Sequence, residues 1–146
     1  MIYTELTKKA LMLCFEAHKD QVDKSGLPYV FHPFHLAEQM TDELSTVAAL
    51  LHDVVEDTPY TLPDLREMGF PEEVLEALRL LAHDDGTPYL DYVARLKDNP
   101  IARVVKLADL QHNSDLSRLG HVDEHALKRA EKYRKAIAIL EHAQDL

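Results

Sequence analysis

Apolar residues recur along this chain at the three- and four-residue spacing of an amphipathic helix. The first such stripe consists of Tyr3, Leu6, Ala10, Leu13 and Ala17. A similar stripe runs through residues 126–140, and no segment sustains the period-two alternation of a strand. The pattern predicts helices near residues 4–20, 33–40, 43–56, 62–68, 71–83, 88–98, 100–118 and 123–143.

Glycine and proline separate these runs. Gly69, Gly86 and Gly120 fall where predicted helices should end, and glycine tolerates the left-handed conformation that often follows a helix. Prolines precede several runs, where the fixed φ of proline suits a first helical turn. We predict an all-α fold, with residues 1–146 forming one compact domain and residues 21–31 forming the clearest early loop.

The charge balance narrows the class of partner. The chain of 146 residues has 26 acidic and 16 basic side chains, which gives a net charge of −10. Such a chain is a poor candidate for nonspecific binding of nucleic-acid polymers or anionic membranes, although a local basic pocket is compatible with this charge. The N-terminus lacks an apolar stretch long enough for a signal peptide or membrane span. Cys14 is the only cysteine, which suits a reducing cytoplasm, and we expect a cytoplasmic protein.

Candidate chemistry begins in residues 48–58, which read AALLHDVVEDT. If this helix is continuous, Glu56 lies one turn after His52 and Asp53, and Asp57 lies one turn after Asp53. Clustered carboxylates repel one another, so a cation or a raised pKa is needed to hold them together. The alternative is a helix end with solvated acids, which the helix dipole disfavours.

Two other segments could complete a metal site. His32 precedes Pro33 at a predicted helix start, where it could instead act as a polar cap. Asp109 lies in the apolar run VVKLADLQHN, where a carboxylate is costly unless it is paired or coordinated. Its alternative partner is Lys106, three residues earlier, in an ordinary ion pair along a helix.

These residues, in this order, resemble a known pattern. His32, then His52-Asp53, then Asp109 resemble the H…HD…D set of the HD-domain metal-dependent phosphohydrolases. The segments AHKDQ, KSGLPYVFHP, ALLHDVVEDT and VKLADLQHN resemble the hydrolase domain of the RelA/SpoT family and its small free-standing relatives. The resemblance covers roughly residues 15–119 and implies the helical HD-domain fold.

The resemblance also implies a reaction and its residues. One divalent metal would be bound by His32, His52, Asp53 and Asp109. Mn²⁺ is the metal expected, and Fe²⁺ or Zn²⁺ would suit the same donors. The pair Glu56 and Asp57 would orient and deprotonate the attacking water. The implied substrate is guanosine-3′,5′-bis(diphosphate), which would lose its 3′-pyrophosphate. The residues expected to contact this nucleotide are Lys24, Ser25 and Asn113.

Basic side chains near the site would balance phosphate charge. Lys24 and Lys106 are the first candidates, followed by Arg103 and Arg118. The loop also departs from the family pattern, because Asp23 stands where the family usually has an arginine. Ser114-Asp115 likewise follows Asn113 where a basic residue is usual.

Two alternatives therefore stay open beside the alarmone hydrolase. The chain could hydrolyse another phosphorylated nucleotide, or it could be a nucleotide-sensing module without turnover. The sequence does not fix the oligomeric state, and a homodimer is one alternative.

Overall fold

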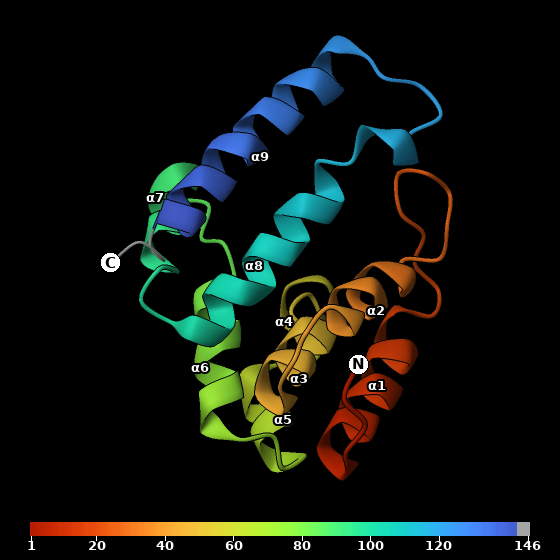
Figure 1. The fold of residues 1–146 in the computed structure, drawn as a ribbon. Helices are drawn as coiled ribbons and strands as arrows, with labels where there is room; N and C mark the ends of the chain where they lie inside the picture. The colour runs from red at the N-terminus through yellow and green to blue at the C-terminus, as the bar shows by residue number, and fades with distance from the viewer. Residues whose placement is uncertain (143–146) are drawn as a thin grey trace.

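The computed structural model describes residues 1–142, and the regular elements in that range are helical (Figure 1). In chain order these are α1 (Glu5–His18), α2 (Phe31–Glu38), α3 (Glu43–Leu51), α4 (Val54–Asp57), α5 (Leu62–Glu67), α6 (Glu72–Leu81), α7 (Tyr89–Arg95), α8 (Pro100–Asn113), the 3-10 turn η1 (Leu116–Arg118) and α9 (Glu124–His142). The predicted all-α fold is confirmed. The final residue of the last predicted helix, position 143, lies outside the described residues.

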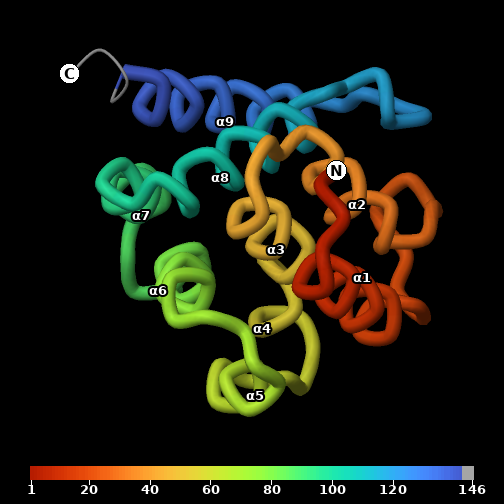
Figure 2. The backbone as a smooth tube through the Cα atoms, turned by 60° about the horizontal axis from the view of Figure 1, so that its bottom comes forward, coloured from red at the N-terminus to blue at the C-terminus, as the bar shows by residue number. Residues whose placement is uncertain are grey.

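Helix α3 lies at the centre of the molecule (Figure 2). It contacts α1, α2, α6 and α8, and its residues from Ser45 to Leu51 are all buried. A helix that is apolar on every face needs partners on every face, which explains its central position. Helix α9 packs along α8 and also contacts α7, so α8 is enclosed between the centre of the molecule and the C-terminal helix.

Polar side chains fix where several helices begin. Thr4 and Thr61 form capping boxes at α1 and α5, while Asp42 and Asn99 accept a backbone N–H at the start of α3 and α8. Each cap satisfies an N–H that lacks a partner within its helix. His52 directly follows α3, and Asp109 lies in α8. The caps that start these two helices therefore help to fix where both residues lie.

The single helix predicted over residues 43–56 is wrong in one respect, because the structure divides it into α3 and α4. The His52 side chain lies 2.7 Å from the Ala49 carbonyl oxygen through its Nδ1. In a continuous helix that carbonyl would accept the N–H of Asp53. The backbone of Asp53 has φ −103° and ψ −1°, outside the regular helix. The imidazole thus competes for the carbonyl where the helix is interrupted.

The helix predicted over residues 100–118 is also too long, because α8 ends at Asn113. Asp115 has an extended ψ of 98°, and its carboxylate accepts hydrogen bonds from the backbone and hydroxyl of Ser117 at 3.0 and 2.6 Å. Such local bonds compete with the helix ladder. The remaining helices begin and end within three residues of their predicted limits. No helix in the described range is long and apolar enough to span a membrane.

Candidate metal centre

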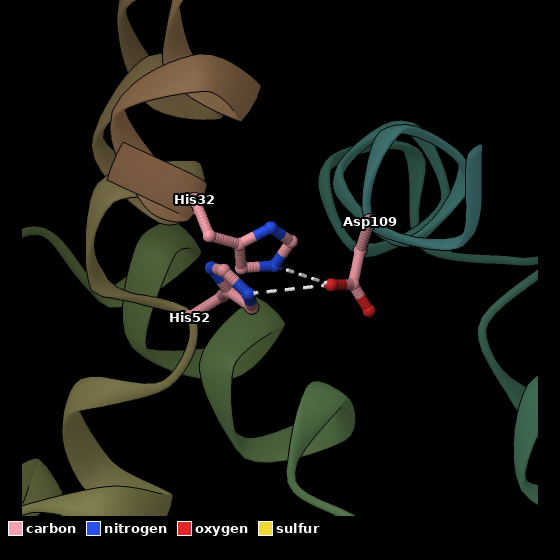
Figure 3. A group of neighbouring side chains, drawn as sticks. All are labelled: His32, His52 and Asp109. Carbon is pink, nitrogen blue, oxygen red and sulfur yellow. Dashed lines mark hydrogen bonds and ion pairs between the residues drawn. The ribbon is translucent and has the colours of Figure 1, made fainter. Parts of the chain in front are cut away.

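Three residues far apart in the sequence meet between α2, α3 and α8 (Figure 3). His32 lies in the first turn of α2, His52 directly follows α3, and Asp109 lies in α8. One nitrogen or oxygen of each lies within 4.8 Å of the other two, and all three residues are buried. Nε2 of His32 is 2.8 Å, and Nε2 of His52 is 3.6 Å, from the same Oδ1 of Asp109.

The hydrogen bonding of His52 shows what this cluster needs. Its Nδ1 faces the carbonyl of Ala49, and a carbonyl only accepts, so Nδ1 carries a proton. The other nitrogen of the neutral ring, Nε2, then presents a lone pair. This buried Nε2 makes no hydrogen bond of acceptable geometry, although it lies 2.9 Å from Oδ2 of Asp53. A lone pair that faces two carboxylates requires a cation between them, and a metal ion or a proton meets that need.

Without a metal, the cation is a proton. Burial lowers the pKa of His52, but the charges of Asp53 and Asp109 outweigh burial and raise that pKa well above its usual value. Two imidazole nitrogens and carboxylate oxygens form a donor set that suits Mn²⁺, Fe²⁺ or Zn²⁺. The residues therefore fit a divalent metal, whose binding would displace the proton from His52.

Asp53 lies at the break between α3 and α4, outside the three-residue cluster, and contacts it through His52. Its Oδ2 also accepts a hydrogen bond from the hydroxyl of Tyr29. Burial raises the pKa of Asp53, but the neighbouring His52 outweighs burial and lowers that pKa to about 2. Asp53 is therefore an ionised carboxylate beside the cluster.

Asp109 is held by donors on its own helix. Lys106 donates to Oδ2 at 3.1 Å and Asn113 donates to Oδ1 at 3.0 Å. Burial raises the pKa of Asp109, but Lys106, followed by His32 and His52, outweighs burial and lowers that pKa well below its usual value. The Lys106–Asp109 ion pair considered as an alternative therefore forms, and the cluster forms as well.

His112 is a site residue that the sequence reasoning missed. Its Nδ1 lies 2.6 Å from Nδ1 of His32, and the two rings stack with centroids 4.9 Å apart and planes 10° from parallel. If Nε2 of His32 binds a cation, Nδ1 of His32 carries the proton and donates it to Nδ1 of His112. The available signal was the position of His112 in VKLADLQHN, one helical turn after Asp109.

Two cavities adjoin the cluster. The larger cavity, of about 440 Å³, is lined by His32, and the smaller cavity, of about 190 Å³, is lined by His52. The residues that line both are Asp53, Asp109, Asn113 and Tyr133. The two cavities thus meet at the cluster, and a ligand in either reaches the same carboxylates.

The neighbours Glu56 and Asp57 line different cavities. Glu56 lines the smaller cavity and Asp57 lines the larger one. Burial raises the pKa of each carboxyl group, and the negative charge of Asp53 adds to the effect. The expected continuous helix is wrong, because the break leaves the two acids on the short α4, but Glu56 still lines the cavity that His52 lines.

The three residues expected to contact nucleotide all line the larger cavity. Lys24 and Ser25 come from the loop before α2, and Asn113 also lines the smaller cavity. Of the additional cations, Lys106 lines the smaller cavity and Arg118 the larger one, while Arg103 lines neither.

Curated proteins related to this chain carry names from alarmone metabolism. A guanosine-3′,5′-bis(diphosphate) 3′-pyrophosphohydrolase of Haemophilus influenzae is 45% identical over 124 residues, which cover 70% of this chain and 17% of that protein. The bifunctional (p)ppGpp synthase/hydrolase SpoT of Escherichia coli is 33% identical over 122 residues, covering 73% of this chain and 17% of SpoT. A GTP pyrophosphokinase of Streptomyces coelicolor is 35% identical over 154 residues, covering 92% of this chain and 16% of that protein. The chain thus spans about a sixth of the length of these relatives.

A solved structure shares the fold. It is described as a metazoan ortholog of SpoT that hydrolyses ppGpp, and it superimposes with a TM-score of 0.68 at 23% sequence identity. The match covers 98% of this chain and 96% of the other. No family model matches the sequence. From the sequence similarity over most of its length and from this shared helical fold, we conclude that the chain belongs to the RelA/SpoT family, as an HD-type domain.

Proposed function

We propose that this chain is a metal-dependent phosphohydrolase that acts on guanosine-3′,5′-bis(diphosphate) and releases pyrophosphate and GDP. The observation that carries the proposal is the buried cluster of His32, His52 and Asp109, where Nε2 of His52 faces the carboxylates of Asp53 and Asp109. The names of the relatives supply the substrate class. The chemistry is the addition of one water, which breaks the bond between the 3′-oxygen and phosphorus.

We propose that His32, His52, Asp53 and Asp109 hold one divalent metal, with Mn²⁺ as the expected ion. Such an ion, when bound, lowers the pKa of a water molecule and neutralises charge on a phosphoryl oxygen. His52 would bind through Nε2, because its Nδ1 is committed to Ala49. Asp53 would complete the ligand set from the helix break, where the hydroxyl of Tyr29 holds its carboxylate.

Glu56 is the proposed general base. Its pKa is raised by burial and by Asp53, so its carboxylate holds a proton more tightly than an ordinary glutamate does. Glu56 would accept the proton of the attacking water from the smaller cavity, and Asp57 would orient that water from the larger one. Lys106, over the rings of Tyr89 and Tyr92, would place its ammonium beside the phosphoryl group.

Lys24, Ser25 and Asn113 are the proposed nucleotide contacts of the larger cavity. The hydroxyl of Ser25 donates a hydrogen bond to the Arg118 carbonyl at 2.9 Å, so the loop before α2 is bonded to η1, which also lines this cavity. A second candidate function, hydrolysis of a different phosphorylated nucleotide, is favoured by one observation. The carboxylates Asp23 and Asp115 line the larger cavity, where they oppose a polyanion.

We further propose that residues 1–146 form one domain and that the protein acts in the cytoplasm on a small molecule. Helices from both halves of the sequence pack on α3, which supports the first proposal. The free thiol of Cys14 is fully buried in that core, which suits a reducing compartment.

The test is hydrolysis by the purified chain with Mn²⁺ of guanosine-3′,5′-bis(diphosphate), its adenosine counterpart, and NADPH. We expect pyrophosphate and GDP from the first, with the activity lost in His52→Ala together with tight Mn²⁺ binding. Glu56→Ala should lose turnover while it keeps Mn²⁺. Turnover of another nucleotide alone would replace the substrate. Nucleotide binding by a metal-loaded chain that cleaves none of them would instead indicate a sensor.

A further inference from the structure

Two side chains of opposite charge meet across the wall of the larger cavity. Asp23 belongs to the loop before α2, and Arg118 belongs to η1, 95 residues later. A guanidinium nitrogen of Arg118 lies 3.5 Å from Oδ2 of Asp23, and the two side chains are 24% and 14% exposed. Asp23 therefore does not face the cavity as an isolated negative charge.

The protein fixes both partners of this pair. Oδ1 of Asp23 accepts the backbone N–H of Ser25 at 2.8 Å and of Leu27 at 3.0 Å. A second nitrogen of Arg118 donates to the carbonyl of His112 at 2.8 Å. Guanidinium N–H groups lie in the plane of the group, so these acceptors occupy its edge. The flat face of the guanidinium is what remains for a ligand in the cavity.

The surroundings favour an aromatic ring over a phosphate at that face. The Arg118–Asp23 pair is neutral as a whole, and a phosphate beside it would meet the carboxylate as well as the guanidinium. The apolar side chains that line the same cavity are Val22, Leu116, Leu119 and Ala126. A guanidinium face stacks well on an aromatic ring and is more weakly hydrated than an ammonium.

We propose that Arg118 is the stacking platform for the nucleotide base and that Asp23 is the positioning residue that holds its guanidinium flat. This inference rests on the proposed function only in taking the occupant of the larger cavity to be a nucleotide. It also gives Asp23 a second role, because its carboxylate disfavours a phosphate beside the pair and at the same time holds the guanidinium for the base.

Two probes separate stacking from phosphate binding. GDP carries a base, and inorganic pyrophosphate does not, and the affinity of each for the Mn²⁺-loaded chain can be measured by calorimetry. We expect Arg118→Ala and Arg118→Lys each to weaken GDP binding by about five- to thirtyfold, the range of a partly desolvated cation–π contact. Pyrophosphate affinity should stay unchanged in Arg118→Lys, which still balances Asp23, and should fall by less than GDP affinity in Arg118→Ala, which leaves the Asp23 carboxylate unbalanced. The lysine variant keeps the charge and loses only the planar face.

Asp23→Asn tests the positioning role. Asparagine can still accept the two backbone N–H groups of the loop, so it removes the ion pair and keeps the turn. We expect GDP to bind several-fold more weakly, and pyrophosphate more tightly because the guanidinium charge is no longer balanced. A residue that only supported the loop would not raise pyrophosphate affinity.

The matched control is Arg134→Ala on α9, which removes an exposed arginine that pairs with Glu131 at 3.2 Å, and it should change neither affinity. Thermal melts of each variant monitor folding. Three results would each overturn the role of Arg118 as a stacking platform. The first is an Arg118→Lys variant that binds GDP as tightly as the wild type does. The others are a variant that loses as much pyrophosphate affinity as GDP affinity, and a wild type that does not bind GDP. Hydrolysis of guanosine-3′,5′-bis(diphosphate) is measured in a separate assay, so that the proposed function and this inference are tested independently. GDP binding that needs Arg118, in a chain that cleaves nothing, would refute the proposed function and uphold this inference.

Discussion

At the scale of single residues, the partners of the imidazole nitrogens decide which atoms can bind a cation. His52 has its Nδ1 committed to a backbone carbonyl, and His32 has its Nδ1 committed to His112. Both rings therefore turn Nε2 toward the carboxylate of Asp109. Partners of this kind orient metal-binding histidines and fix their tautomers.

His112→Phe should weaken Mn²⁺ binding by about 10- to 100-fold, the usual cost of losing such a partner. Phenylalanine can keep the stack on His32 but cannot accept its Nδ1–H. Free Mn²⁺ measured by electron paramagnetic resonance gives the affinity. His35→Phe is the control, because the His35 ring lies against His112 with centroids 4.4 Å apart and planes tilted by 34°, and His35 is not part of the cluster. Equal affinities for wild type and His112→Phe would contradict the assigned tautomer.

Glu56→Gln should make the metal-free protein more stable at pH 7. Burial and Asp53 raise the pKa of Glu56 above the unfolded value of about 4.3. The folded state therefore holds the proton more tightly, and ionisation lowers stability as pH rises through the folded pKa. The penalty is complete above that pKa and absent below the unfolded one. Because Glu56 is exposed, we expect less than about 1 kcal/mol.

Urea unfolding in the presence of a chelator checks this sign, with a gain for Glu56→Gln at pH 7 and none at pH 3. Glu72→Gln is the control of opposite sign, because a hydrogen bond from Arg66 lowers the pKa of Glu72 and its ionised form is the favoured one. A loss of stability in Glu56→Gln at pH 7 would show that Glu56 is paired in the folded state.

At the scale of elements, local capping and local competition set where the site residues lie. The cap at Asn99 starts α8, which carries Asp109 and then ends at Asn113. The break after α3 places His52 and Asp53 on backbone that is no longer a regular helix. The predicted continuation of α3 is replaced by the short α4, from which Glu56 lines the smaller cavity and Asp57 the larger one.

Asn99→Ala should lower the free energy of unfolding by about 1 kcal/mol, because it removes the side chain that accepts the Ala102 N–H at 2.9 Å. Asn99→Gly should cost only a few tenths of a kcal/mol, since glycine is tolerated as an N-cap. Chemical denaturation of both variants measures the difference. Equal stability of the alanine variant and wild type would mean that the cap contributes nothing to α8.

At the scale of the whole molecule, the cluster joins α2, the end of α3 and α8, so a bound metal would cross-link three helices. It would also neutralise carboxylates in a chain whose net charge is −10. A ligand that binds only the folded state stabilises it by an amount set by its concentration relative to Kd. Metal binding and global stability are therefore coupled.

Mn²⁺ at one hundred times its Kd should stabilise the wild type by about 2.7 kcal/mol. The same concentration should leave the Tm of His52→Ala nearly unchanged, because that variant lacks one ligand. Calorimetric melts with and without Mn²⁺ measure the shift, and His35→Ala, altered on the same helix as His32, should respond like wild type. An equal Mn²⁺ shift in His52→Ala would place the metal elsewhere.

The sequence by itself determined the helical class, most helix limits and the segments that carry the site. Helix spacing, caps and proline positions are local, because backbone hydrogen bonds join residues four apart. His52 and Asp109 could be singled out because each follows an apolar run, and His32 because it precedes a proline at a helix start, whereas the resemblance to the HD-domain pattern joined them into one site.

Only the tertiary structure decided how those residues are used. The tautomer of His52 and the break that it accompanies depend on which carbonyl the ring meets, and the contact of His32 with His112 joins residues 80 positions apart. The division of Glu56 and Asp57 between two cavities, and the pairing of Asp23 with Arg118, depend on how loops and helices pack. The spacing of apolar residues along one segment does not predict such contacts, because they arise from packing between segments that lie far apart in the sequence.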